Sequence, residues 1–179
     1  SLHDALPISI ALSDSEVRFI YNLLPVGHFY DKRYGEVWVT DEKLRQMEAN
    51  FGKSPAYEVP VKIGHGDGAK SPGKVIGIQA KDTGLEITMI VDAETAKAIN
   101  DKQYRYMSAE FDENYQNKET GEFVGAVLLG AALVNQPANP YMEPLILVDD
   151  ILEAIELRLS YISDNKEEVK SNITYKHDN

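Results

Sequence analysis

Cysteine is absent from the sequence, which excludes disulfide bonds, thiolate catalysis and cysteine-ligated metals together. Basic residues are scarce: 18 Lys and Arg stand against 29 Asp and Glu, giving a formal net charge of −11. No cluster of Lys and Arg forms a basic patch, which argues against nucleic acid as a partner because phosphates require concentrated positive charge. A chain without cysteine fits a reducing compartment, so we expect a cytoplasmic protein.

Long hydrophobic runs are also missing, since no segment approaches the roughly 20 apolar residues that span a bilayer. We therefore expect a soluble protein with no membrane partner. The first ten residues lack the basic and apolar regions of a signal peptide. The stretch SLHDALPIS is similar to translated sequencing adapter, so residues 1–10 are expected to be foreign or disordered, and His3 is given no role.

The 43% of hydrophobic residues suits one globular domain with a sizeable core, which we place at residues 11–147. An amphipathic helix is predicted at residues 148–162, because apolar residues recur there every three or four positions. Residues 163–179 are polar and charged, which predicts a flexible acidic and polar tail. His177 lies in this tail and is expected to have no function.

Short alternating or β-branched segments between turn residues predict six or seven strands with three helices. The clearest strand segments are residues 36–40, 59–63, 74–80, 85–91, 104–111 and 122–134, with a short one at 145–148. The KDTG stretch at 81–84 predicts a hairpin turn. These elements indicate an α+β domain with a strongly curved sheet or barrel.

Thr40 or Asp41 is expected to cap a helix that runs to Phe51, and Asp92 to cap a helix at 93–100. Residues 13–27 fit either a helix or a strand, although Pro25 and Gly27 favour an extended chain near the end. Trp38, the only tryptophan, is expected to pack in the core.

Two stretches carry residues suited to catalysis. In VPVKIGHGDG, His65 follows a β-branched run and lies between glycines, so little would block its access to a substrate. In YRYMSAEF, strand alternation places Tyr106, Ser108 and Glu110 on one face. A serine hydroxyl needs a base to become a nucleophile, and histidine is the usual one. We therefore predict that His65 and Ser108 form a proteolytic pair.

Two alternatives were weighed against this pair. His28 is a second possible base, but its place in PVGHFYDKRYG predicts a turn residue. A metal-dependent hydrolase could use His65 with Asp67 or Asp82, yet metal sites usually gather several His, Asp or Glu residues. Only one of the four histidines lies in a plausible core motif, so no metal or other cofactor is expected.

The order of four segments resembles that of the phage capsid maturation proteases, especially the Mu-like I proteins that combine protease and scaffold. The segments are PVGHFYDKRYGEVWVTDEKLRQMEANF, VPVKIGHGDG, YRYMSAEF and GAALVNQPANP. The resemblance runs from about Leu23 to Leu147. In that family a Gly-His or Asp-His step supplies the base and a serine after a Tyr-rich strand the nucleophile, which implies His65 and Ser108 here. The NQPA stretch is similar to the family's ALTN.PA signature.

The resemblance implies a compact antiparallel β-barrel with flanking helices, as in the herpesvirus assemblins. It also implies a serine endopeptidase of prohead maturation, which cleaves phage scaffold and major capsid proteins inside the assembling procapsid in the host cytoplasm. Autoproteolysis in the tail after Ile162 and a homodimer are compatible with it. The alternative is a catalytically inactive scaffold or capsid-assembly protein that keeps the fold.

One departure from the family concerns the third polar residue, often a carboxylate in the strand before the Pro-Ala step, which orients the histidine. Gly130 stands at about that point, and residues 123–134 contain no acid. Three residues elsewhere are candidates for the role: Glu110, Asp67 and Asn135. A dyad, or a triad completed by water, is equally open. The oxyanion hole is also open, with glycines at positions 66, 125 and 130 as candidates.

Overall fold

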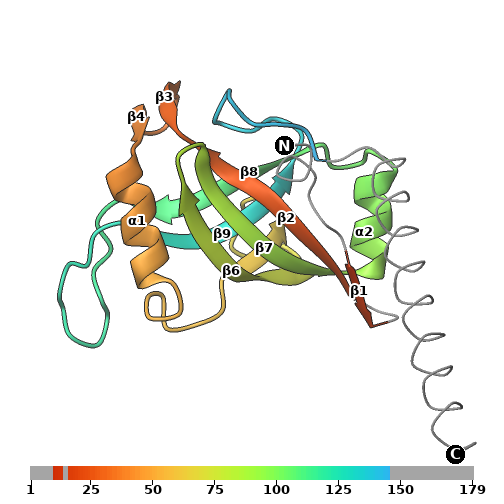
Figure 1. Ribbon diagram of the computed structural model, residues 1–179, viewed down its shortest axis with the longest axis horizontal. Coiled ribbons are helices and arrows are strands. Elements are labelled where there is room, and N and C mark those ends of the chain that lie inside the picture. Colours follow the sequence, from red (N-terminus) through yellow and green to blue (C-terminus); the bar gives the residue numbers. More distant parts are fainter. Residues whose placement is uncertain (1–9, 14–15, 146–179) are drawn as a thin grey trace, which may run out of the picture.

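The computed structural model describes residues 10–13 and 16–145, which form a β-rich α+β unit (Figure 1). The main sheet contains β1 (Ile10–Ser13), β2 (Glu16–Pro25), β5 (Pro60–Ile63), β6 (Gly73–Lys81), β7 (Gly84–Asp92), β8 (Tyr106–Asp112) and β9 (Val127–Val134). A separate ribbon consists of β3 (Gly27–Asp31) and β4 (Gly35–Val39), and the helices are α1 (Asp41–Asn50) and α2 (Ala93–Asn100). The predicted α+β class is confirmed.

The main sheet has the strand order β1-β2-β7-β6-β5-β9-β8 and curls strongly (Figure 1). Its neighbouring strands run antiparallel except β5 and β9, which are parallel. The expectation of antiparallel pairing throughout was therefore wrong at this one pair. Alternation of side chains is the same in both kinds of ladder, so it does not reveal the direction of strands distant in the sequence. Within the described residues, β1 and β8 are the two edges of an open sheet.

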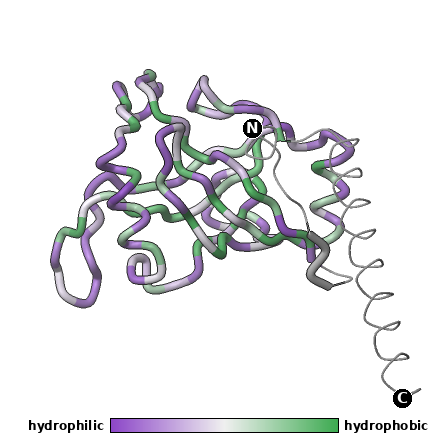
Figure 2. The backbone as a smooth tube through the Cα atoms, viewed as in Figure 1, coloured by the Kyte–Doolittle hydropathy of each residue, from purple (hydrophilic) through white to green (hydrophobic). Residues whose placement is uncertain are grey.

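The core lies inside the curl and follows the predicted strand alternation. In β7, Leu85, Ile87, Met89 and Val91 are at most 1% exposed, as expected from their shared face. Leu44 and Met47 of α1 belong to the same buried cluster. The loop between β8 and β9, at the left of Figure 2, is largely hydrophilic. That loop extends to Ala126, so the strand predicted at residues 122–134 begins only at Val127.

Helix α1 begins as predicted, because the Thr40 side chain accepts a hydrogen bond from the Lys43 backbone N–H at 3.3 Å. The helix then holds the entry to β9. Gln46 Oε1 accepts from the Ala126 N–H at 2.9 Å, and Asn50 Nδ2 donates to the carbonyls of residues 124 and 126 at 3.0 Å each. These contacts fix where β9 begins relative to the sheet.

The described chain ends in a segment that lies between β2 and β8. The Tyr21 hydroxyl of β2 donates to the Glu143 carbonyl, and the Leu145 N–H donates to the Arg105 carbonyl at 2.7 Å. Burial raises the pKa of the Tyr21 phenol, opposed in part by the Met107 backbone N–H of β8. The segment thus spans the gap between β2 and the edge strand β8.

The β3–β4 ribbon buries one face and exposes the other. Phe29, Val37 and Val39 are buried, whereas Trp38 is 52% exposed and stacks on His28 with ring centroids 4.0 Å apart. The expected core position of Trp38 was therefore wrong, because the alternation in EVWVT places the two valines inward. His28 lies in a strand rather than a turn.

Residues 13–27, left open between helix and strand, are extended: β2 and the first residue of β3 account for most of them. The expected segments at residues 1–9 and 146–179, including the C-terminal helix and tail, lie outside the described residues. Within the described part, no helix combines the length and apolar character needed to cross a membrane.

Helix α2 offers a test of its predicted cap. Asp92 Oδ1 accepts from the Thr95 N–H at 2.8 Å. Hydrogen bonding by the Thr95 side chain, and to a smaller extent by its backbone N–H, lowers the pKa of the Asp92 carboxyl. Asp92→Ala should reduce the free energy of unfolding by about 1 kcal/mol at neutral pH, measured by urea denaturation.

The lowered pKa fixes the pH dependence. The ionised cap stabilises the fold above the unfolded-state pKa of about 3.9, and this contribution is lost as the pH falls through the lower folded-state value. The gap between Asp92→Ala and wild type should therefore shrink in acid. Asp92→Asn keeps an acceptor and is the control; a gap independent of pH would contradict the assignment.

Candidate active site

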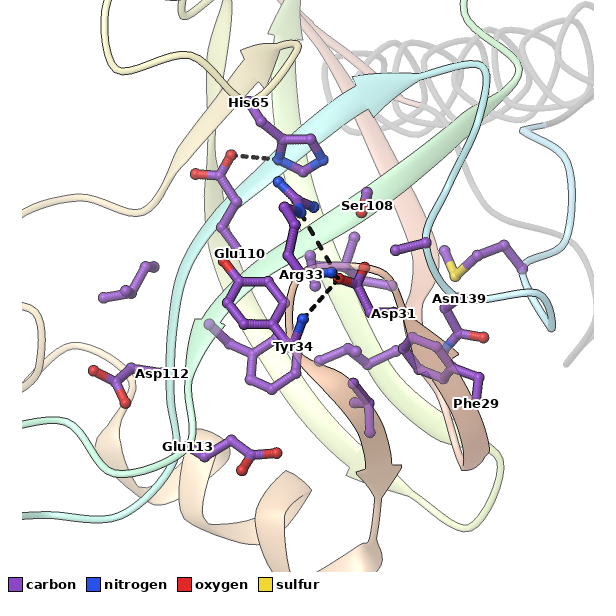
Figure 3. Close-up of a pocket in the computed structure, with 18 of the residues that line it drawn as sticks. Phe29, Asp31, Arg33, Tyr34, His65, Ser108, Glu110, Asp112, Glu113 and Asn139 are labelled. Carbon is purple, nitrogen blue, oxygen red and sulfur yellow. Dashed lines mark hydrogen bonds and ion pairs between the residues drawn. The ribbon is translucent and has the colours of Figure 1, made fainter.

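A cavity of about 710 Å³ lies between β8, the β3–β4 ribbon and the segment that follows β9 (Figure 3). Both predicted catalytic residues, His65 and Ser108, line it. They come from segments more than 40 residues apart, so only the fold brings them to one cavity. Part of the wall is apolar, with Phe29 and Met142 among its residues.

His65 is held by the turn that ends β5. Gly64 adopts φ +75°, a conformation that favours glycine, and its N–H donates to the Leu133 carbonyl of β9 at 3.1 Å. The strand thus stops at Ile63, and the next side chain stands at its end, as the sequence predicted. His65 remains one-third exposed.

Ser108 is positioned by the pairing of β8 with β9. It lies opposite Ala132 and is 7% exposed, whereas its neighbour Met107 points into the core with no exposed surface. Glu110, two residues further along the same strand, shares the face of Ser108. Within the described residues no hydrogen bond joins Ser108 to His65.

Glu110 forms the closest polar contact of His65. Its Oε2 lies 2.7 Å from His65 Nδ1 (Figure 3). A carboxylate accepts hydrogen bonds only, so this contact favours the tautomer with the proton on Nδ1 and leaves Nε2 free to accept. Lys62 Nζ donates to both oxygens of the same carboxylate, at 2.9 and 3.2 Å.

Gly130 makes room for this carboxylate. It pairs directly with Glu110 across the β8–β9 ladder, and a Cβ at position 130 would lie 2.9 Å from Glu110 Oε1. The carboxylate of Glu110 on β8 therefore occupies space that a side chain at position 130 would fill.

The other two candidates for the third position lie elsewhere. Asn135 joins the strand ends, since its side chain accepts from the Arg105 N–H and donates to the Gln103 carbonyl, both at 2.9 Å. Asp67 is exposed and does not line the cavity. His28 faces away on the ribbon, where its Nε2 lies 2.7 Å from Glu36 Oε1. No group of three or more His, Asp or Glu within the described residues is placed to hold a metal ion.

The tip of the ribbon adds residues that the sequence did not single out. The Asp31 carboxylate accepts from the backbone N–H groups of Arg33 and Tyr34, at 2.7 and 3.2 Å. This fixed turn lets Arg33 point toward His65 from across the cavity (Figure 3). The DKRYG turn pattern was visible in the sequence, but its position against the histidine was not.

The NQPANP segment holds the ribbon in place. The Asn139 side chain is buried and accepts from the Tyr141 N–H at 2.9 Å, and the Tyr141 hydroxyl donates to the His28 carbonyl at 2.8 Å. The Tyr141 ring lies against Gly27, where a Cβ would approach it to 2.8 Å. The segment therefore connects the end of β9 to the wall of the cavity.

Fold and cavity together describe a β-rich α+β protein with a histidine, a serine and a carboxylate gathered at one edge of a curled sheet, a residue set suited to hydrolysis. Comparison with protein families matches residues 21–146 to the N-terminal domain of the Mu-like prophage I protein. The chain belongs to this family, so the resemblance and a phage-related role are confirmed. No curated protein matched the chain.

The space at Gly130 can be tested directly. Gly130→Ala should lower the urea midpoint only slightly, because the added methyl group meets the end of the Glu110 side chain, which can shift within its contacts to Lys62 and His65, rather than the backbone. The same movement should disturb the contact between Glu110 and His65, which NMR of the His65 ring nitrogens would detect.

Gly77→Ala is the matched control. Gly77 is also a strand glycine, but the nearest atom to an added Cβ would be 4.0 Å away. It should leave the His65 signals unchanged. Identical His65 spectra for Gly130→Ala and wild type would contradict the packing of Glu110 against Gly130.

Proposed function

We propose that this protein is a serine endopeptidase of phage prohead maturation that cleaves scaffold and major capsid proteins. The observation that carries the proposal is the cavity shared by Ser108 and His65, with the Glu110 carboxylate 2.7 Å from His65 Nδ1. Membership of the Mu-like prophage family supplies the phage context. The apolar wall and open side of the cavity suit an extended peptide.

In this proposal Ser108 Oγ attacks the carbonyl carbon of the scissile peptide bond while His65 Nε2 accepts its proton. The C–N bond then breaks, and the imidazolium returns the proton to the departing amine. Water hydrolyses the acyl-enzyme by the same route and releases Ser108. Glu110 acts as a positioning residue, because it holds Nδ1–H and stabilises the charged imidazolium.

We also propose that the curled sheet is an assemblin-like barrel. β1 pairs only with the start of β2, so the later part of β2 has an edge that faces β8. The segment carrying Glu143 and Leu145 bridges that gap through hydrogen bonds to both sides. A barrel closed by an irregular segment rather than a ladder accounts for these contacts.

Ser108→Ala is the principal test. Wild-type protein should react covalently with a fluorophosphonate probe, with the added mass on Ser108, and should cleave the scaffold or capsid protein expressed beside it in the phage. Ser108→Ala should lose both reactions without loss of stability, because alanine fits the buried position.

Ser71→Ala is the control, since Ser71 is an exposed serine whose hydroxyl donates to the backbone carbonyls of Val61 and Gly73. It should react as wild type does. If wild-type protein neither labels nor cleaves, and assembly proceeds equally with Ser108→Ala, the inactive scaffold or capsid-assembly function is the correct one.

The role of Glu110 can be tested by moving its carboxylate from β8 to the facing position 130 on β9. Glu110→Ala should slow labelling by on the order of 10⁴-fold, the loss seen when a serine-protease triad lacks its acid. The double variant Glu110→Ala with Gly130→Glu should recover part of that rate, because position 130 lies directly opposite in the ladder.

The single variant Gly130→Glu serves as the control and should be slower than wild type, since two carboxylates would compete for one space. A double variant no faster than Glu110→Ala, although folded, would contradict the role of Glu110.

A further inference from the structure

We propose that Lys62 is a fourth member of the site, a positioning residue that fixes the Glu110 carboxylate against His65. The inference rests on the proposed function, and it names a residue that neither the family pattern nor the sequence analysis assigned. Lys62 lies in β5 between Val61 and Ile63. Packing of the core does not require a lysine at this position, so its burial calls for another explanation.

The contacts of Lys62 use its whole ammonium group. Nζ donates to Glu110 Oε1 at 2.9 Å, to Glu110 Oε2 at 3.2 Å and to the His65 carbonyl at 3.3 Å. An ammonium has three N–H donors, so these three acceptors satisfy it. Only 12% of the Lys62 side chain is exposed, which separates it from an ordinary surface ion pair.

Strand register explains how the lysine reaches the carboxylate. Lys62 pairs with Ala132 of β9, and Ala132 pairs with Ser108 of β8, so the three residues form one row across the sheet. On β9, the two residues of that face that lie opposite Ser108 and Glu110 are Ala132 and Gly130. Two small residues thus leave a path along which the lysine stem crosses the strand and meets Glu110.

The arrangement determines the orientation of the catalytic base. With its ammonium bound to both carboxylate oxygens, Lys62 restricts rotation of Glu110 and keeps Oε2 directed at His65 Nδ1. Its bond to the His65 carbonyl fixes the backbone of the same residue. Glu110 is only partly buried, so without this cation its carboxylate would turn toward water, and the histidine would lose its constraint.

The test is a double-mutant cycle on the rate of Ser108 phosphonylation by a fluorophosphonate. Lys62→Met keeps the length of the side chain and removes its charge. It should lower the maximum rate by about 100-fold, the scale expected for a misplaced catalytic group, with an unchanged half-saturating probe concentration. Because Lys62 acts chiefly through Glu110, and its bond to the His65 carbonyl is the longest of its three, Lys62→Met should have a much smaller effect in a Glu110→Ala background.

Lys74→Met is the matched control. Lys74 lies on the adjacent strand β6 and pairs with Glu58 at 2.7 Å, but it is 40% exposed and outside the cavity. It should react at the wild-type rate. Lys62→Arg keeps a cation and should retain most of the rate, which supplies a folded variant should methionine fail to fold.

Two results would overturn the role of Lys62: a wild-type rate for Lys62→Met, or the same further loss in both backgrounds. If wild-type protein is not phosphonylated, the proposed function fails, and NMR then decides the placement of Lys62. The low-field Nδ1–H signal of His65 should persist in Lys74→Met and move or vanish in Lys62→Met. An unchanged signal in Lys62→Met would overturn it.

Discussion

The register between β5, β9 and β8 is the constraint on which the rest of the site depends. It aligns Lys62, Ala132 and Ser108 in one row and sets Glu110 opposite Gly130. A shift of β8 by one residue would turn Ser108 and Glu110 into the core and bring Met107 to the cavity. The buried face of these strands therefore secures the chemistry on the other face.

The acid beside His65 illustrates that a position in space can be filled from either of two paired strands. A family pattern read along one strand shows a missing carboxylate at Gly130. Across the ladder, the Glu110 carboxylate extends into the volume that glycine leaves free.

Much of the fold could be predicted because local rules act within a few residues. The Thr40 and Asp92 caps and the buried face of β7 follow from spacing alone. The parallel β5–β9 pair could not, because it depends on which distant strand lies adjacent. The outward Trp38 follows from the local alternation in EVWVT, which outweighs the usual preference of a large aromatic side chain for the core. His65 and Ser108 could be named as candidates from their local sequence. The contact that favours Glu110 over Asp67 and Asn135 could not, because it depends on the register between strands that are distant in the sequence.

The outward position of Trp38 determines what the intrinsic fluorescence of the protein would measure in solution. Its indole stacks on His28 at the outer face of the β3–β4 ribbon, whose inner face borders the cavity. Since no other tryptophan exists in the chain, intrinsic emission follows the surroundings of this ribbon rather than the state of the core. Fluorescence would thus register a ligand or partner at the cavity wall, and global unfolding would need a second optical signal.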